Sequence, residues 1–192
     1  GDAIQLSVDL EIQAFVERRL SAAVEKRHAG GGRAIVIRPD SGEILAIADV
    51  INPREGWPGQ PEDPLRVEHR RLGRNRCVSD PYEPGSTFKP FVWAVATEAG
   101  LATPDEVLPT PEAIPYRTES GRRIRDVHYY GPMSWRRVLV KSLNSGMAII
   151  AERMTAAQMQ NTLTRFGFGQ RTGCGIAGET AGLITTADRW TS

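Results

Sequence analysis

The segment from Asp80 to Gly100, DPYEPGSTFKPFVWAVATEAG, places a serine directly after Pro-Gly and a lysine three residues later. Residues three apart lie on one face of a helix, so Ser86 and Lys89 would be separated by about 4.5 Å along its axis. A serine hydroxyl is a weak nucleophile until a base takes its proton, and a lysine with a depressed pKa can be that base. The pair therefore predicts covalent catalysis through a serine.

The position of this pair at the start of a helix strengthens the prediction. The first turn of a helix has unpaired backbone N–H groups and the positive end of the helix dipole, which stabilise an oxyanion. Pro90 fits the first turn, where its missing N–H breaks no intrahelical bond. A serine N-cap followed by a surface lysine would look the same, so a second element is needed.

The stretch VKSLNSGMA supplies that second element, because Ser142 and Asn144 form a Ser-x-Asn at the junction of two predicted helices. Side chains at such a junction can point into a cleft, although both residues could also be local caps. Ser-x-x-Lys followed by Ser-x-Asn is the beginning of the signature shared by penicillin-binding proteins and serine β-lactamases.

The elements expected to position these residues are a hairpin and several helices. A helix follows the cap Asp9 and stops at Gly30–Gly32, and two strands follow around the turn 39–42. Apolar residues on both faces of each strand predict that both faces are covered. Helices are expected at 86–99, from Thr103, at 134–141, at 146–154 and from the capping box at Thr155, with loops over 51–80, 109–132 and 167–182.

Composition excludes several classes of function. The chain has 192 residues and a net charge of +1, which gives no global field for nucleic acid or a membrane. No apolar run approaches the ~18 residues of a spanning helix. Two cysteines, three scattered histidines and a GxGxxG at 173–178 without a flanking strand and helix predict no disulfide framework, no metal and no cofactor. A local basic run is interpreted as a solvated loop or an anion-facing patch. It consists of five arginines: Arg66, Arg70, Arg71, Arg74 and Arg76.

The chain resembles the transpeptidase domain of class B penicillin-binding proteins, the cell-wall enzymes of elongation and division. NRCVSDPYEPGSTFKPF is similar to the nucleophile segment of that family, and GRAIVIRPDSGEILAIADV to its first hairpin. SVDLEIQ resembles the start of the domain, IRDVHYYGPMSWRRVLVKSLNSGMA the approach to its second motif, and FGFGQRTGCGIAGETAGLI the Gly-rich loop that follows.

The resemblance implies a fold and a mechanism. The fold would be α+β, of the penicillin-binding-protein and serine β-lactamase type, with an antiparallel sheet flanked by helices. Ser86 would be the acylated nucleophile and Lys89 its general base. Ser142 would relay protons to the leaving amine, and Asn144 would hold Lys89 and a substrate amide. The enzyme would be a serine-type D-Ala-D-Ala transpeptidase that crosslinks peptidoglycan stem peptides and is acylated by β-lactam antibiotics.

The third motif of the family, Lys-Thr-Gly or Lys-Ser-Gly, does not occur in the sequence. Arg171-Thr172-Gly173 is the nearest approximation, but it lies too soon after Asn144 and outside any strand signal. We therefore expect residues 1–192 to be the N-terminal part of a single transpeptidase domain, with the first hairpin and the mainly helical part. The missing C-terminal part, as a second chain or as a disordered segment, would be a partner, and the fragment alone would be inactive. The parent would act on the periplasmic face, anchored by a transmembrane helix, with divisome or elongasome proteins as partners.

Two alternative functions remain open at this point. A β-lactam or peptidoglycan sensor would carry the same residues and would be identified by slow deacylation and a fused signalling segment. A non-catalytic scaffold would be identified by the absence of the third motif from the complete gene. A β-lactamase-type hydrolase is disfavoured, because YEPGSTFKPF resembles the class B enzymes instead.

Overall fold

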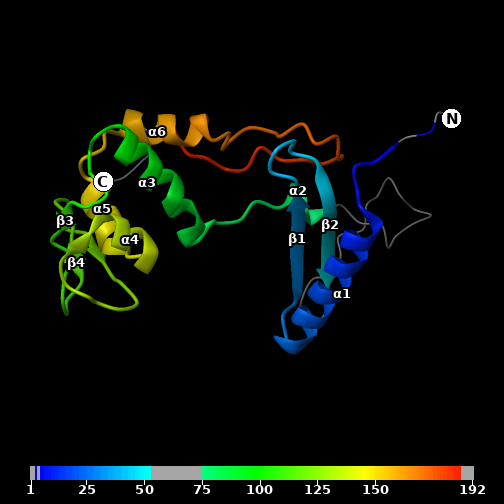
Figure 1. Cartoon of the computed structure of the whole chain (residues 1–192), viewed down its shortest axis with the longest axis horizontal. Coiled ribbons are helices and arrows are strands. Elements are labelled where there is room, and N and C mark those ends of the chain that lie inside the picture. Colours follow the sequence, from blue (N-terminus) through cyan, green and yellow to red (C-terminus); the bar gives the residue numbers. More distant parts are fainter. Residues whose placement is uncertain (1–2, 4, 53–74, 187–192) are drawn as a thin grey trace. The chain divides into compact units, whose positions relative to one another are not determined.

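The computed structural model describes residues 3, 5–52 and 75–186 (Figure 1). The chain divides into two compact units. The first comprises Gly1–Pro81 together with Gly173–Thr180, and the second comprises Tyr82–Thr172 together with Ala181–Ser192. The first unit is a helix on a hairpin, and the second is mainly helical.

In the first unit, helix α1 (Leu10–Lys26) begins at the predicted cap. The Asp9 carboxylate accepts hydrogen bonds from the backbone N–H groups of Glu11 and Ile12. The helix ends earlier than the glycines suggested, because His28 adopts a left-handed conformation with φ of 52°. Its N–H donates to the Glu25 carbonyl and that of Ala29 to the Val24 carbonyl, which satisfies the last carbonyls of the helix.

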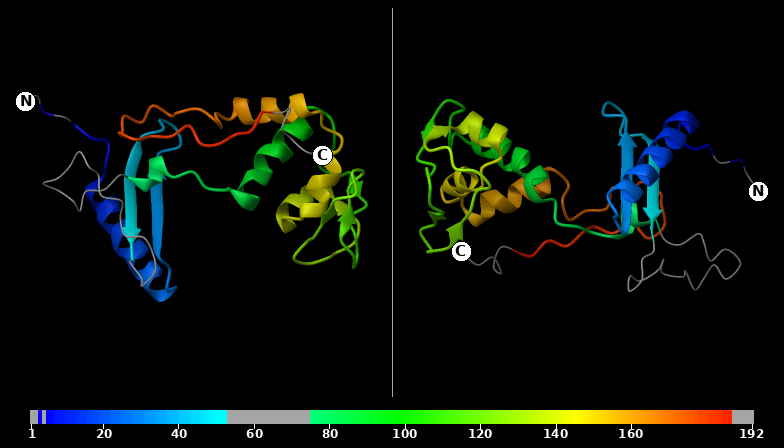
Figure 2. Two further views of the ribbon diagram at one scale, coloured as in Figure 1. Left: turned by 180° about the vertical axis from the view of Figure 1, so that it is seen from behind. Right: turned by 90° about the horizontal axis from the view of Figure 1, so that it is seen from below.

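Strands β1 (Gly31–Ile37) and β2 (Ile44–Ile51) form the predicted antiparallel hairpin, and α1 packs on one face of it (Figures 1 and 2). Small residues make this close packing possible. A Cβ at position 32 would lie 2.9 Å from side-chain carbons of Leu20 and Val24, so a larger residue there would have to displace them. Ile35 and Ile37, on the other face, are 40% and 53% exposed, so the expectation that both faces are covered is only partly met within the described residues.

The N-terminal segment also covers the outer edge of β2. The Gln13 side chain accepts a hydrogen bond from the Ile47 N–H at 2.8 Å and donates to the Ile47 carbonyl at 3.0 Å. The Asp9 N–H donates to the Leu45 carbonyl. Backbone groups that a lone hairpin would leave unpaired therefore have partners on this side.

A short helix, α2 (Arg76–Ser79), lies against the hairpin inside the segment predicted to be irregular. The Arg76 guanidinium forms a bidentate ion pair with Asp49 of β2, and the two side chains are only 15% and 12% exposed. Arg76 is thus a structural residue, not part of a solvated run. The other four arginines of that run lie outside the described residues.

In the second unit, helices α3 (Lys89–Glu98), α4 (Trp135–Lys141) and α5 (Asn144–Ala151) contribute to one core, and α6 (Ala156–Arg165) packs against α3. Trp93 stacks on Trp135 with ring centroids 5.9 Å apart and packs, partly buried, against the core. The Trp135 indole donates to the Thr97 hydroxyl at 2.9 Å, and that of Trp93 donates to the Trp135 carbonyl at 3.1 Å. These bonds tie α3 to the start of α4.

Two predictions about this unit are wrong. The segment from Thr103 is a turn and not a helix, because the chain leaves it at β3 (Val107–Leu108), which pairs with β6 (Met133–Ser134). The stretch 109–132 is not all loop, since β4 (Tyr116–Arg117) and β5 (Arg123–Ile124) form a second short pair. Helix α5 begins at Asn144, earlier than expected. The capping box at Thr155 is confirmed.

Candidate active site

Ser86 lies in a short 3-10 helix, η2 (Gly85–Phe88), which leads directly into α3. Gly85 enters this turn with φ of 56°, a conformation that glycine adopts without steric cost. The Ser86 carbonyl accepts the Lys89 backbone N–H, and the Ser86 side chain is exposed. The predicted helix start is therefore present, with Ser86 in a tighter turn than an α-helix.

Aromatic rings hold this turn in place. The Phe88 ring, between Ser86 and Lys89 in sequence, packs edge-on against Phe168 with centroids 5.3 Å apart. Phe91, one turn further along, packs against Phe166 at 4.8 Å. Because Phe166 and Phe168 follow α6 directly, the end of that helix fixes the position of the turn that carries Ser86.

Lys89 is the centre of the site. Its Nζ donates hydrogen bonds to the Ser142 carbonyl at 2.5 Å, to the Ser142 hydroxyl at 3.1 Å and to the Asn144 side-chain oxygen at 2.7 Å. The structure thus joins Lys89 to two residues more than 50 positions later in the chain, as the two motifs together predicted. Within the described residues, no hydrogen bond joins the Ser86 hydroxyl to Lys89.

The junction of α4 and α5 presents Ser142 and Asn144 to that lysine. Ser142 ends α4 in a left-handed conformation, with φ of 54° and ψ of 40°, and α5 starts two residues later. Leu143, between them, is 3% exposed and belongs to the core. One apolar residue is thus buried, while its two polar neighbours are exposed and bond to Lys89.

The orientation of the Asn144 amide follows from its two partners. Its nitrogen donates to the Arg125 carbonyl at 2.8 Å, which leaves its oxygen to accept from Lys89. The reverse orientation would oppose a nitrogen to the ammonium and an oxygen to a carbonyl, so the hydrogen bonds exclude it.

One residue at the site was not found from the sequence. The Asp126 carboxylate accepts hydrogen bonds from the backbone N–H groups of Asn144 and Ser145, the latter at 3.1 Å. Asp126 lies in a segment with no regular structure, 18 residues before Asn144, so helix periodicity gives no signal for it. The lack of a Ser, Thr, Asp or Asn at position 143, just before α5, was the available hint that another residue caps that helix.

Burial and charge act on Lys89 in opposite directions. Burial lowers the pKa of the Lys89 ammonium below its ordinary value, because the charged form loses hydration, and the negative charge of Asp126 raises it. Burial dominates, so the net pKa lies below that of an ordinary lysine. A lysine in this state is more readily deprotonated and can act as a base.

The three acceptors around Lys89 determine how it could change protonation state. An ammonium has three N–H donors, and all three have partners here. A neutral amine has two donors and a lone pair, so one partner must then donate to it. Of the three, only the Ser142 hydroxyl carries a hydrogen that it can donate. Among these three partners, the Ser142 hydroxyl is therefore the one that can exchange a proton with Lys89.

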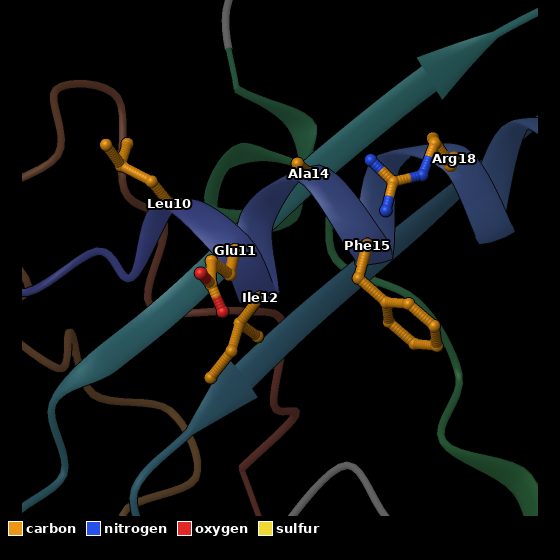
Figure 3. Close-up of a pocket in the computed structure, with 6 residues that line it drawn as sticks. All are labelled: Leu10, Glu11, Ile12, Ala14, Phe15 and Arg18. Carbon is orange, nitrogen blue, oxygen red and sulfur yellow. The ribbon is translucent and has the colours of Figure 1, made fainter.

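Other features carry no comparable chemistry. An open hollow beside α1 is lined by Leu10, Glu11, Ile12, Ala14, Phe15 and Arg18, with no serine, cysteine or lysine (Figure 3). The described residues contain no group of three or more His, Cys, Asp or Glu side chains suited to a metal. Residues 171–173 lie in irregular backbone, and no described helix has the length and apolar content to cross a membrane.

The architecture is α+β, with a helix-covered antiparallel hairpin and a mainly helical unit, as predicted. Residues 32–192 match the model of the penicillin binding protein transpeptidase domain, and this match runs across both units. The chain belongs to this family.

Curated relatives agree with that assignment. The chain is 36% identical over 189 residues to the peptidoglycan D,D-transpeptidase FtsI of Escherichia coli, covering 97% of this chain and 30% of that protein. It is 36% identical over 192 residues to the penicillin-binding protein PbpB of Mycolicibacterium smegmatis, covering 99% and 28%. The chain spans about 30% of the length of these two relatives.

Solved structures show the same fold. The transpeptidase domain of penicillin-binding protein 3 from Burkholderia pseudomallei superposes with a TM-score of 0.78 at 31% identity, over 100% of this chain and 51% of that one. Penicillin binding protein 3 from Mycobacterium tuberculosis, solved in complex with ampicillin, gives 0.78 at 33% identity, over 97% and 40%. The predicted fold class is confirmed.

Proposed function

We propose that this chain carries the acylation site of a peptidoglycan D,D-transpeptidase. Ser86 is the nucleophile, Lys89 its general base, Ser142 the proton relay, and Asn144 the residue that holds Lys89 and a substrate amide. The observation that carries the proposal is the hydrogen bonding of Lys89, with its lowered pKa, to both Ser142 and Asn144. The relatives named peptidoglycan D,D-transpeptidase support it.

In the first half-reaction, neutral Lys89 removes the proton from the Ser86 hydroxyl as Oγ attacks the penultimate carbonyl of a stem peptide ending in D-Ala-D-Ala. The positive end of the α3 dipole favours negative charge near Ser86. The proton on Lys89 then reaches the leaving nitrogen through the Ser142 hydroxyl, 3.1 Å from Nζ. The C–N bond breaks, D-Ala departs, and Ser86 carries the acyl group as an ester.

In the second half-reaction, an amine from a neighbouring strand attacks that ester. The amine loses a proton to the Ser142 and Lys89 pair, a new amide bond forms, and the Ser86 hydroxyl regains its proton. A β-lactam ring is opened by the first half-reaction in the same way. Its acyl group stays attached to the ring remnant, so no leaving group clears the site and the enzyme is blocked.

We further propose that the oxyanion and the substrate carboxylate are bound in part by residues outside this chain. The Lys-Thr-Gly or Lys-Ser-Gly expected from the resemblance is absent from the sequence, and the chain covers 51% of a solved transpeptidase domain. Residues 1–192 would then be the N-terminal part of one such domain. We also propose that the protein acts outside the cytoplasm, at the periplasmic face of the membrane, because its proposed substrates belong to the cell wall.

The test is an intact mass spectrum before and after incubation with penicillin, on the protein purified at its natural length. We expect an adduct of one drug molecule on wild type and none on Ser86→Ala. Ser120→Ala, which removes an exposed hydroxyl that bonds only locally to Thr118, is the matched control and should still be acylated. An unmodified wild type would refute the acyl-enzyme and favour a non-catalytic scaffold. An adduct that survives in Ser86→Ala would place the nucleophile elsewhere.

A further inference from the structure

Asp126 makes contacts at the active site that the proposed mechanism does not use. One of its carboxylate oxygens accepts the backbone N–H groups of both Asn144 and Ser145, the first two residues of α5. The residue before the helix is Leu143, which has no side-chain cap to offer. Asp126 therefore caps the N-terminus of α5 from a distant segment, and its charge lies at the positive end of the α5 dipole.

The backbone of the same segment bonds to the Asn144 side chain. The Arg125 carbonyl accepts the Asn144 amide nitrogen at 2.8 Å, while Asp126 accepts the Asn144 backbone N–H. Asn144 is thus held at two points by residues 125 and 126. With both fixed, its side-chain oxygen has one direction left, toward the Lys89 Nζ at 2.7 Å.

The second oxygen of Asp126 has a different environment. It is buried and has no hydrogen-bond partner among the described residues. A buried carboxylate oxygen without a donor is costly unless a positive charge compensates it. Asp126 and the Lys89 ammonium attract each other, which raises the Lys89 pKa.

We infer that Asp126 is a positioning residue of the acylation site. It fixes the start of α5 so that Asn144 faces Lys89, and it keeps a negative charge near the lysine. This inference rests on the proposed function of Ser86 and Lys89. The acceptor oxygen and the charge of the Asp126 carboxylate are separate properties, and each can be removed by itself.

The experiment compares Asp126→Ala and Asp126→Asn with wild type at natural length. The rate of acylation by a fluorescent penicillin is measured across pH, together with amide hydrogen exchange of Asn144 and Ser145. Asp105→Asn is the matched control, since it removes a carboxylate charge at a side chain that is 88% exposed. It should change neither the rate nor the pH profile.

For Asp126→Ala we expect faster exchange at both amides and an acylation rate reduced about tenfold to a hundredfold, since a misplacement of about 1 Å has that effect. Asp126→Asn keeps an acceptor oxygen, so protection and most of the rate should return. Its acidic limb should move to lower pH, because the Lys89 pKa falls when the negative charge is lost.

A residue that only stabilised the fold would lower the rate in both variants without moving the limb. Equal rates for wild type and Asp126→Ala, or an acidic limb unmoved in Asp126→Asn, would overturn the inference. Failure of wild type to be acylated at Ser86 would instead overturn the proposed function. In that event the exchange data still decide whether Asp126 holds the start of α5.

Discussion

Gly146→Ala tests whether the close contact of α4 and α5 sets the geometry of the site. A Cβ at position 146 would lie 2.5 and 2.6 Å from the two methyl carbons of Val138. Carbon atoms pack at about 3.5–4.0 Å, so the overlap is about 1 Å on each methyl. Val138 is fully buried and β-branched, so its side chain has no free rotamer to occupy.

Two effects of opposite sign determine the size of the change. Alanine is favoured over glycine in a helix by about 1 kcal/mol, whereas overpacking of a core costs about 1–3 kcal/mol. We therefore expect Gly146→Ala to lower the free energy of unfolding by up to about 2 kcal/mol. Acylation should also slow, because Ser142 and Asn144 lie between the helices that are pushed apart.

The assay is urea unfolding of wild type, Gly146→Ala, Val138→Ala and the double variant. Val138→Ala removes the two methyls that the new Cβ would meet, so the double variant should be more stable than the sum of the single changes predicts, by at least about 1 kcal/mol. Additivity within about 0.5 kcal/mol would show that the helices adjust freely and that the contact does not fix the site.

Two further predictions concern stability away from the site. Arg76→Met should destabilise the protein by about 3 kcal/mol in urea unfolding, because it leaves Asp49 buried without its partner. Burial raises the Asp49 pKa, but the Arg76 bonds lower it more. The ion pair therefore stabilises the fold fully above the ordinary pKa of 3.8, and this stabilisation is lost as the pH falls through the lower folded-state pKa. A stability deficit of Arg76→Met that persists unchanged in acid would contradict this. Thr155→Ala should cost about 1 kcal/mol in the same assay through loss of the α6 capping box, while Thr155→Ser should restore it; equal losses in both would assign the effect to packing of the methyl group.

The sequence predicted those elements whose causes are local. Asp9 and Thr155 cap their helices as expected, because a cap depends on residues within one turn. The Pro39–Gly42 turn and the apolar strands beside it produced the hairpin for the same reason. The pairing of Ser86 and Lys89 with Ser142 and Asn144 came from motif order, and the hydrogen bonds of Lys89 join three of these four residues.

Long-range contacts explain the errors. Thr103-Pro104-Asp105-Glu106 has the local chemistry of a helix start, and the Thr103 N–H does bond the Glu106 carboxylate at 3.4 Å. Pairing of Val107 with Ser134, far along the chain, takes the backbone into a strand instead. Asp126 was missed for a related reason, since its two N–H donors are 18 and 19 residues away and no periodic pattern records such a bond.

The left-handed backbone of Ser142 has a consequence for the evolution of this site. A side chain at φ of 54° costs roughly 1–2 kcal/mol relative to glycine, so Ser142→Gly should stabilise the fold. That substitution would also remove the hydroxyl beside Lys89. Serine at this position therefore exchanges backbone stability for a hydroxyl within hydrogen-bond reach of Lys89.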